Sequence, residues 1–221
     1  MGVNPKGIRV GPSSGGRSAI KTADARAYQG YRSDVVLDVR AHPLVLHEFT
    51  AALTRVGFSP AGETQEGHQH RWVRDLASID VLIPQGLGRA ATVKRGVTGA
   101  TTLSSPGAQQ AIRRAEPVGV QVDQTEGTVH RPNLIGALVS KAAAYSVPGD
   151  PNKARHIIDF AALAAMARRS DRIAQQLSAG DRKHLAPMLT ALAASRPLWS
   201  STPGAERGVL ALTRLAGQEI K

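Results

Sequence analysis

Three aspartates stand in or beside two apolar segments whose residues favour β-strands. Asp34 and Asp38 lie in RSDVVLDV (residues 32–39), and Asp80 lies in SIDVLIP (residues 78–84). A charged carboxylate between Ile and Val is costly to bury unless a cation neutralises it. Mg²⁺ is such a cation, since it takes carboxylate oxygens and bridges them to substrate phosphates. Carboxylates on two neighbouring strands would therefore form a phosphoryl-transfer site; alternatively, each Asp caps a turn or pairs with an arginine.

The spacing within the first segment limits how it could hold a metal ion. Asp34 and Asp38 are four residues apart, so a regular strand would place both on one face, about 13 Å from each other. One ion cannot join them unless the strand bulges or ends between them.

Other residues could assist such chemistry by binding phosphates. Gly15 and Gly16 precede an expected helix over 18–28, where backbone N–H groups can approach a phosphate. Lys141 stands on an otherwise apolar helix, and its side chain either extends to solvent or points into a cleft towards a triphosphate. Asp159 shares a helix face with Arg155, which also fits a local ion pair.

The elements that must position these residues form an α+β pattern. We expect strands over 8–10, 34–39, 70–74, 78–83, 118–122 and 128–130. A helix should follow Pro43, with a buried stripe that runs from Leu44 to Val56, and Gly57 should end it. A short helix over 107–115 comes next. From Pro132 onward four Ala-rich segments have helical periodicity: 132–145, 152–169, 181–195 and 204–217.

This pattern predicts two domains. Residues 1–131 would form a mixed sheet with flanking helices, and residues 132–221 would form an all-helical half that widens a basic groove. The chain has 28 Lys and Arg against 17 Asp and Glu, a formal net charge of +11 and no cysteine. Such a surplus of positive charge favours a polyanion, most commonly nucleic acid. Five basic residues around the loop-rich middle are candidates for phosphate contacts: Arg71, Arg74, Arg89, Lys94 and Arg95.

No apolar run is long enough to span a bilayer, and no signal peptide is recognisable at the N-terminus. We therefore expect a cytoplasmic protein that does not contact a membrane.

The order of these motifs resembles that of the AbiEii-type nucleotidyltransferases, which include the MenT toxins and belong to the DNA polymerase β-like superfamily. A Gly-Gly pair precedes Arg-Ser-Asp-x-x-x-Asp, and an Ile-Asp-Val-Leu strand follows. RPNLIGALVSKAAA (residues 131–144) then looks like the family's lysine helix, and KARHIIDFAALAAM (residues 153–166) looks like its basic-His-x-x-Asp helix. The resemblance covers roughly residues 14–166.

The resemblance implies a nucleotidyltransferase fold and a Mg²⁺-dependent transfer of a nucleotide from a nucleoside triphosphate. In the toxins the acceptor is the 3′ end of tRNA, and a cognate antitoxin is a further expected partner. By position, Asp38 and Asp80 match metal-binding carboxylates, Lys141 matches the nucleotide-binding lysine, and Asp159 matches the acidic residue of the helical domain. The nucleotide would contact Lys141 and the earlier motif residues Gly15, Gly16, Arg32 and Ser33.

One position departs from the family pattern. The first strand of the family carries Asp-x-Asp, and Val36 occupies the place of its first Asp. Either Asp34 serves instead, or the site is impaired and the chain binds RNA or a partner without chemistry. A transferase that acts on a small molecule or on a protein is the other alternative.

Overall fold

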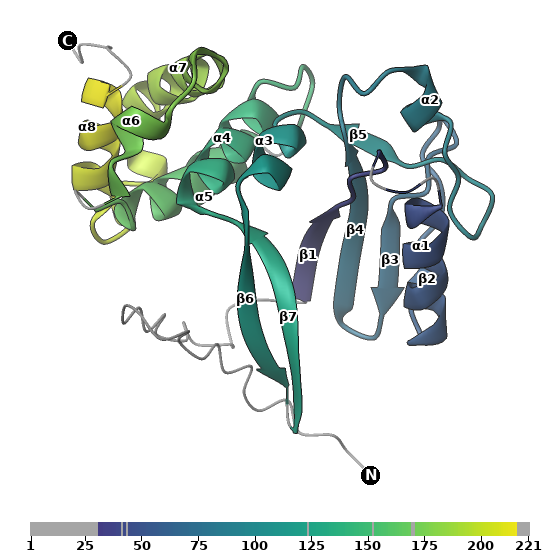
Figure 1. The fold of residues 1–221 in the computed structure, drawn as a ribbon. Helices are drawn as coiled ribbons and strands as arrows, with labels where there is room; N and C mark the ends of the chain where they lie inside the picture. Colours follow the sequence, from purple (N-terminus) through teal and green to yellow (C-terminus); the bar gives the residue numbers. More distant parts are fainter. Residues whose placement is uncertain are drawn as a thin grey trace.

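The computed structural model describes residues 31–40, 42, 44–122, 124–151, 153–168 and 171–215 (Figure 1). They form a mixed α+β structure, as expected. The strands are β1 (Tyr31–Val36), β2 (Ser59–Pro60), β3 (Arg71–Arg74), β4 (Ala77–Pro84), β5 (Leu103–Ser105), β6 (Ala115–Val122) and β7 (Thr125–Pro132). The helices are α1 (Val45–Arg55), α2 (Arg89–Thr92), α3 (Ala108–Arg113), α4 (Leu134–Tyr145), α5 (Lys153–Ala165), α6 (Ile173–Gln176), α7 (Ala179–Ala194) and α8 (Ala205–Leu215), with a short 3₁₀ helix, η2 (Arg196–Leu198), before α8.

The larger sheet is mixed and has the strand order β1-β4-β3-β2. β1 runs parallel to β4, with Asp34 paired to Asp80 in the register, whereas β3 is antiparallel to both β4 and β2. β5 runs parallel to the last residues of β4. The strands predicted over 34–39, 70–74 and 78–83 are therefore present, although β1 ends at Val36 and not at Val39.

Helix α1 covers one face of this sheet because alternate strand residues are apolar. Val81 and Ile83 of β4 and Trp72 of β3 pack with Leu46 and Leu53 of α1 in one buried cluster. The predicted stripe was too wide: Leu44 and Val56 are 56% and 55% exposed, because both lie just outside the helix.

A two-stranded hairpin, β6–β7, projects from the molecule (Figure 1). Its strands pair from Ala115 with Pro132 to Val122 with Thr125, so they are longer than the predicted strands. The hairpin joins the first part of the chain to α4.

The elements after Pro132 are α4 to α8 and η2, and they enclose a second buried cluster. Phe160 of α5 and Met188 and Leu192 of α7 are completely buried at its centre. Asn133 begins α4, because its side chain accepts a hydrogen bond from the Gly136 amide at 3.0 Å. Helices α5 and α8 approach so closely that the backbone of Gly208 touches that of Ala164.

Several short elements were not predicted, namely α2, α6, β2 and β5. The strand expected over 8–10 and the helix expected over 18–28 lie outside the described residues. None of the helices in the described part of the chain is both long and apolar enough to cross a membrane.

Candidate functional site

Asp34 and Asp80 lie side by side on adjacent parallel strands. They are register partners in the β1–β4 pairing, so their side chains leave the sheet on the same face. Their neighbours Val35 and Val81 pack in the cluster with α1. The two carboxylates therefore lie on the face that α1 does not cover.

Arg71 of β3 binds Asp80 with both arms of its guanidinium group. Nε lies 2.8 Å from Oδ1, and Nη2 lies 3.0 Å from Oδ2. The Asp80 side chain is only 3% exposed, whereas that of Arg71 is 41% exposed. The hydrogen bond to Asp80 raises the pKa of Arg71, and the charges of Asp80 and Asp34 add to the increase. Arg71 thus neutralises the carboxylate that the sequence makes costly to bury.

Asp38 lies beyond the end of β1 and is bound by a neighbour in the chain. Arg40 donates to it from the backbone N–H at 3.2 Å and from Nε at 3.2 Å. These contacts, with the side-chain hydrogen bond foremost, hold the pKa of Asp38 below its ordinary value. Across the described residues, no group of three or more His, Cys, Asp or Glu side chains is arranged to hold a metal ion.

Lys141 and Asp159 form an ion pair between neighbouring helices. Nζ of Lys141 on α4 lies 2.9 Å from Oδ2 of Asp159 on α5, and both side chains are 31% exposed. Arg155 lies one helical turn before Asp159 at 3.8 Å, as the four-residue spacing indicated. The resemblance predicted that Lys141 and Asp159 are both site residues, but it did not predict that they would contact each other.

Lys141 and Asp159 belong to helices α4 and α5, whereas Asp34 and Asp80 belong to strands β1 and β4. Helix α3 contacts both β4 and α4 and so lies between them.

Four further residues were predicted to bind the nucleotide: Gly15, Gly16, Arg32 and Ser33. Gly15 and Gly16 lie outside the described residues, and only the backbones of Arg32 and Ser33 are described, as part of β1.

Several of the basic residues expected to bind phosphates make contacts within the protein. Besides Arg71, Arg74 lies over the ring of Phe58 at 4.9 Å and donates to the carbonyl oxygen of Val56 at 2.7 Å. Arg95 donates to the carbonyl oxygen of Gly99 at 2.6 Å.

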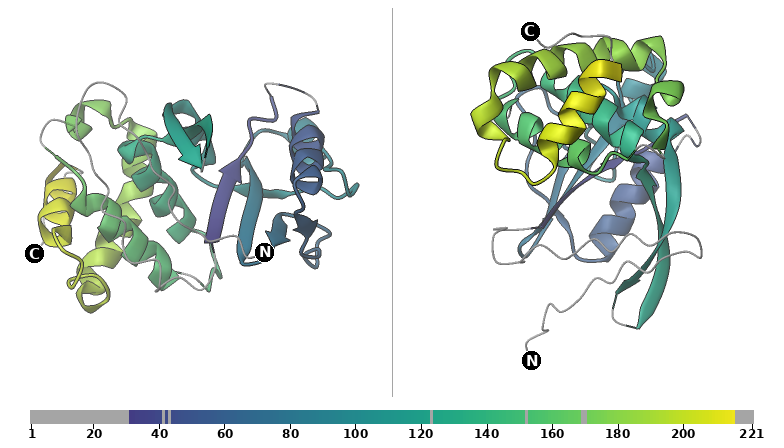
Figure 2. Two further views of the ribbon diagram at one scale, coloured as in Figure 1. Left: turned by 90° about the horizontal axis from the view of Figure 1, so that it is seen from below. Right: turned by 90° about the vertical axis from the view of Figure 1, so that its left-hand side faces the viewer.

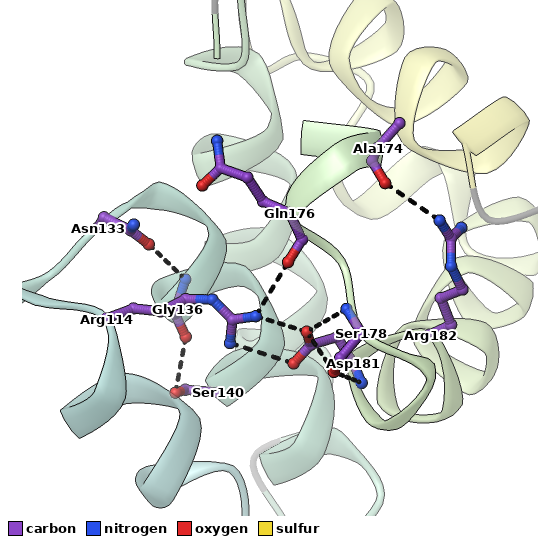
Figure 3. Close-up of polar contacts among 9 residues, drawn as sticks. All are labelled: Arg114, Asn133, Gly136, Ser140, Ala174, Gln176, Ser178, Asp181 and Arg182. Carbon is purple, nitrogen blue, oxygen red and sulfur yellow. Dashed lines mark hydrogen bonds and ion pairs between the residues drawn. The ribbon is translucent and has the colours of Figure 1, made fainter. Parts of the chain in front are cut away.

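A buried ion pair that the sequence did not reveal joins Arg114, after α3, to Asp181 in α7 (Figure 3). Nη2 of Arg114 lies 2.6 Å from Oδ2 of Asp181, and Nη1 lies 3.2 Å from Oδ1. The backbone N–H and the hydroxyl group of Ser178 also donate to Oδ2, at 2.8 and 2.7 Å. Burial opposes ionisation of Asp181, but the hydrogen bonds from Arg114 and Ser178 outweigh it and lower its pKa.

The Ser178-x-x-Asp181 spacing is a capping-box signature that could have revealed the first turn of α7. It would not have revealed Arg114, which is 67 residues away in the chain. The network ties α7 to α3, so we assign it a structural role.

No protein-family model matches the chain, and no curated protein or solved structure is significantly similar to it. The class that the fold defines is a mixed α+β protein with a mixed sheet and eight helices in the described residues.

Proposed function

We propose that this protein is a Mg²⁺-dependent nucleotidyltransferase that transfers nucleotides from a nucleoside triphosphate to RNA, with the tRNA 3′ end as the acceptor. In this proposal residues 1–131 form a nucleotidyltransferase-type core and residues 132–221 an all-helical domain. The protein acts in the cytoplasm as the toxin of a toxin–antitoxin pair.

The observation that carries the proposal is the register of Asp34 with Asp80. Phosphoryl transfer needs carboxylates from separate strands at one position, and this pairing supplies two of them. It favours Asp34 over Asp38 as the partner of Asp80, because Asp38 lies past the strand end and is bound by Arg40.

The carboxylates of Asp34 and Asp80 would supply part of the ligand set of a Mg²⁺ ion. Mg²⁺ in phosphoryl-transfer sites is commonly held by one or two carboxylates together with substrate phosphates, so a third carboxylate is not required. Asp34 and Asp80 would hold the ion, which would neutralise developing phosphate charge. Both oxygens of Asp80 already accept hydrogen bonds from Arg71, so Arg71 must share this carboxylate with the ion.

Lys141 would supply positive charge to the triphosphate, and Asp159 would orient it through their ion pair. The hydroxyl oxygen of the RNA end attacks the α-phosphorus, the bond to the bridging oxygen breaks, and pyrophosphate leaves. The proton of the hydroxyl group passes to solvent. The net charge of +11 favours a polyanionic acceptor over a small neutral molecule.

Incubation of the full chain with total tRNA, Mg²⁺ and each labelled nucleoside triphosphate in turn tests the proposal. We expect label at the tRNA 3′ end, which should be lost in Asp34→Asn and Asp80→Asn. Asp34 is exposed, so its variant should fold even if the Asp80 variant does not. Asp75→Asn is the matched control, because Asp75 is an exposed residue of the turn between β3 and β4. Full activity in Asp34→Asn would refute the assignment of the metal site.

A second candidate function is RNA binding by a protein with a nucleotidyltransferase-type fold that transfers no nucleotide. The contacts of Asp80 with Arg71 and of Asp38 with Arg40 favour it, because both carboxylates are already neutralised. Salt-sensitive tRNA binding, with no label from any nucleotide, would establish this alternative.

A further inference from the structure

Four arginines line a single groove in the helical part of the chain. The groove has a volume of about 1170 Å³ and is bordered by α6, by α8 and by the residues after α5. In the described part of the chain, their guanidinium groups have no hydrogen-bond or ion-pair partner. These groove arginines are Arg168, Arg172, Arg207 and Arg214.

Several arginines elsewhere in the described residues, by contrast, form ion pairs within the protein. Arg114 is paired with Asp181, Arg131 with Glu116, and Arg196 with Glu206. Among the described residues, Glu206 is the acidic residue that lines the groove, and its carboxylate is paired with Arg196. Asp171 lines the adjoining cavity, where its carboxylate accepts a hydrogen bond from the backbone N–H of Arg168 at 2.7 Å. The groove therefore has a concentrated positive charge that attracts an anionic partner.

The shape of this surface suits an extended ligand. A second cavity, of about 710 Å³, shares Arg168 and Arg207 with the groove and continues to Arg131 at the base of the β6–β7 hairpin. The start of α4, where backbone N–H groups carry partial positive charge, also borders this cavity. Together the two cavities exceed the usual volume of a small-molecule pocket.

We propose that the groove arginines bind the phosphate backbone of an RNA strand that runs from α8 towards the hairpin. The inference rests on the RNA partner of the proposed function and not on its chemistry. Guanidinium groups bind phosphates through two parallel hydrogen bonds, and such contacts fix the position of a nucleic acid without reading its sequence. Among the described residues that line the groove none is aromatic, so the proposed affinity comes from the arginines and not from base stacking.

The site lies at the end of the helical region farthest from the sheet, where α6 and α8 are neighbours (Figures 1 and 2). It is therefore a binding surface separate from Asp34 and Asp80. RNA held there would be oriented by the helical region while its end reached the sheet.

The test compares two triple variants of the full chain that lose the same charge. The groove variant carries Arg168→Gln, Arg207→Gln and Arg214→Gln; Arg172 is left unchanged because its backbone has a positive φ of 45°. The control variant carries Arg55→Gln, Arg113→Gln and Lys183→Gln, three exposed residues outside both cavities. Circular dichroism checks that both variants fold.

Binding is measured by fluorescence anisotropy with total tRNA and with an oligouridylate of about 20 nucleotides, between about 50 and 300 mM KCl. We expect the groove variant to bind about 10- to 100-fold more weakly at 100 mM salt and to reduce the slope of log K against log salt by about 2 to 3. The control variant should change binding by less than about threefold.

Equal weakening in both variants would overturn the proposal, since the effect would then follow net charge alone. It would also be overturned if an oligoglutamate of equal charge bound the wild type as tightly as RNA, because the groove would then be a site for an acidic protein. Loss of binding in the groove variant, in a protein that labels no tRNA, would refute the transferase and retain the groove. If the protein transfers nucleotides but the groove variant binds RNA as tightly as the wild type, the transferase is retained and the groove proposal is refuted.

Discussion

Arg71 holds both oxygens of the Asp80 carboxylate, at 2.8 and 3.0 Å, and the register partner of Asp80 is a second carboxylate, Asp34. Arg71 therefore stands in the position where a cation would also bind. The hydrogen bond to Asp80 raises the pKa of Arg71, and a guanidinium group is charged at physiological pH even without this increase. The same contact stabilises the sheet and would compete with the proposed metal ion for Asp80.

Arg71→Met tests this competition. The variant leaves the carboxylate of Asp80 buried without its bidentate donor, so the free energy of unfolding at neutral pH should fall by about 3 kcal/mol. If Asp34 and Asp80 bind a cation, millimolar Mg²⁺ should raise the thermal midpoint of this variant more than that of the wild type.

Arg74→Met is the matched control, because Arg74 lies on the same strand but contacts Phe58 and the carbonyl oxygen of Val56. An equal response to Mg²⁺ in the wild type, Arg71→Met and Arg74→Met would argue against a cation site at the paired carboxylates.

Lys141→Ala should abolish nucleotide transfer with little effect on stability. The ion pair with Asp159 is partly exposed, so its loss should change the free energy of unfolding by less than about 1 kcal/mol. If Lys141 binds the triphosphate in the transition state as proposed, loss of its positive charge should reduce the transfer rate by at least about 100-fold. Urea denaturation and the labelled-nucleotide assay measure the two effects separately.

Lys183→Ala, on the exposed surface of α7, is the control for loss of a lysine. If the double variant Lys141→Met, Asp159→Leu kept full activity, the ion pair would be purely structural.

The sequence predicted the longer elements because their patterns extend over enough residues. The β-branched run around Asp80 and the apolar spacing of α4 and α5 identify those elements without further information. Helices such as α6, with four residues, contain a single turn and have no measurable periodicity. The hairpin strands were predicted too short because Pro117 and Gly127 weaken local strand preference, while cross-strand pairing extends the ladder past them.

The site was predicted less completely than the elements. The sequence selects Asp34, Asp38 and Asp80 by residue type, but it does not fix which residue of β1 pairs with Asp80. That choice depends on the register of two parallel strands that are separated in the chain by α1, β2 and β3. Arg71 was missed as the partner of Asp80 because the β3–β4 turn, at Asp75 and Leu76, lacks the glycine or asparagine that signals a hairpin.

Arg114→Met should destabilise the whole fold. It would leave Asp181, which is completely buried, without its charged partner and with only the donors of Ser178. Breaking a buried ion pair in this way costs about 3–5 kcal/mol. Arg113→Met is the control, since Arg113 is the exposed neighbour of Arg114 in the chain. Similar urea midpoints for the two variants would show that the network does not hold α7 to α3.

The same network predicts a loss of stability in acid. The pKa of Asp181 is lowered in the folded protein, so its contribution is complete above the ordinary Asp value of about 4 and is lost as pH falls through the folded value. Wild type should therefore exceed Asp181→Asn in unfolding free energy at pH 6, and the difference should shrink towards pH 3. Denaturation curves across this range measure it. A difference that is constant with pH would mean that ionisation of Asp181 contributes nothing to stability.

Gly208→Ala should be among the most damaging small changes in the helical region. A Cβ atom at Gly208 would lie 1.9 Å from the carbonyl oxygen of Ala164 and 2.3 Å from its carbonyl carbon, so α8 would have to move away from α5. We expect a loss of about 3 kcal/mol, since the contact is with rigid backbone and not with a side chain that can rotate. Gly180→Ala is the opposite case, because Gly180 is an exposed residue of α7 and its nearest neighbouring atom would lie 3.8 Å from the new methyl group. That variant should gain up to about 1 kcal/mol from the higher helix propensity of alanine. Thermal unfolding of the two variants beside the wild type should therefore give shifts of opposite sign, and a stable Gly208→Ala protein would contradict the close packing of α5 against α8.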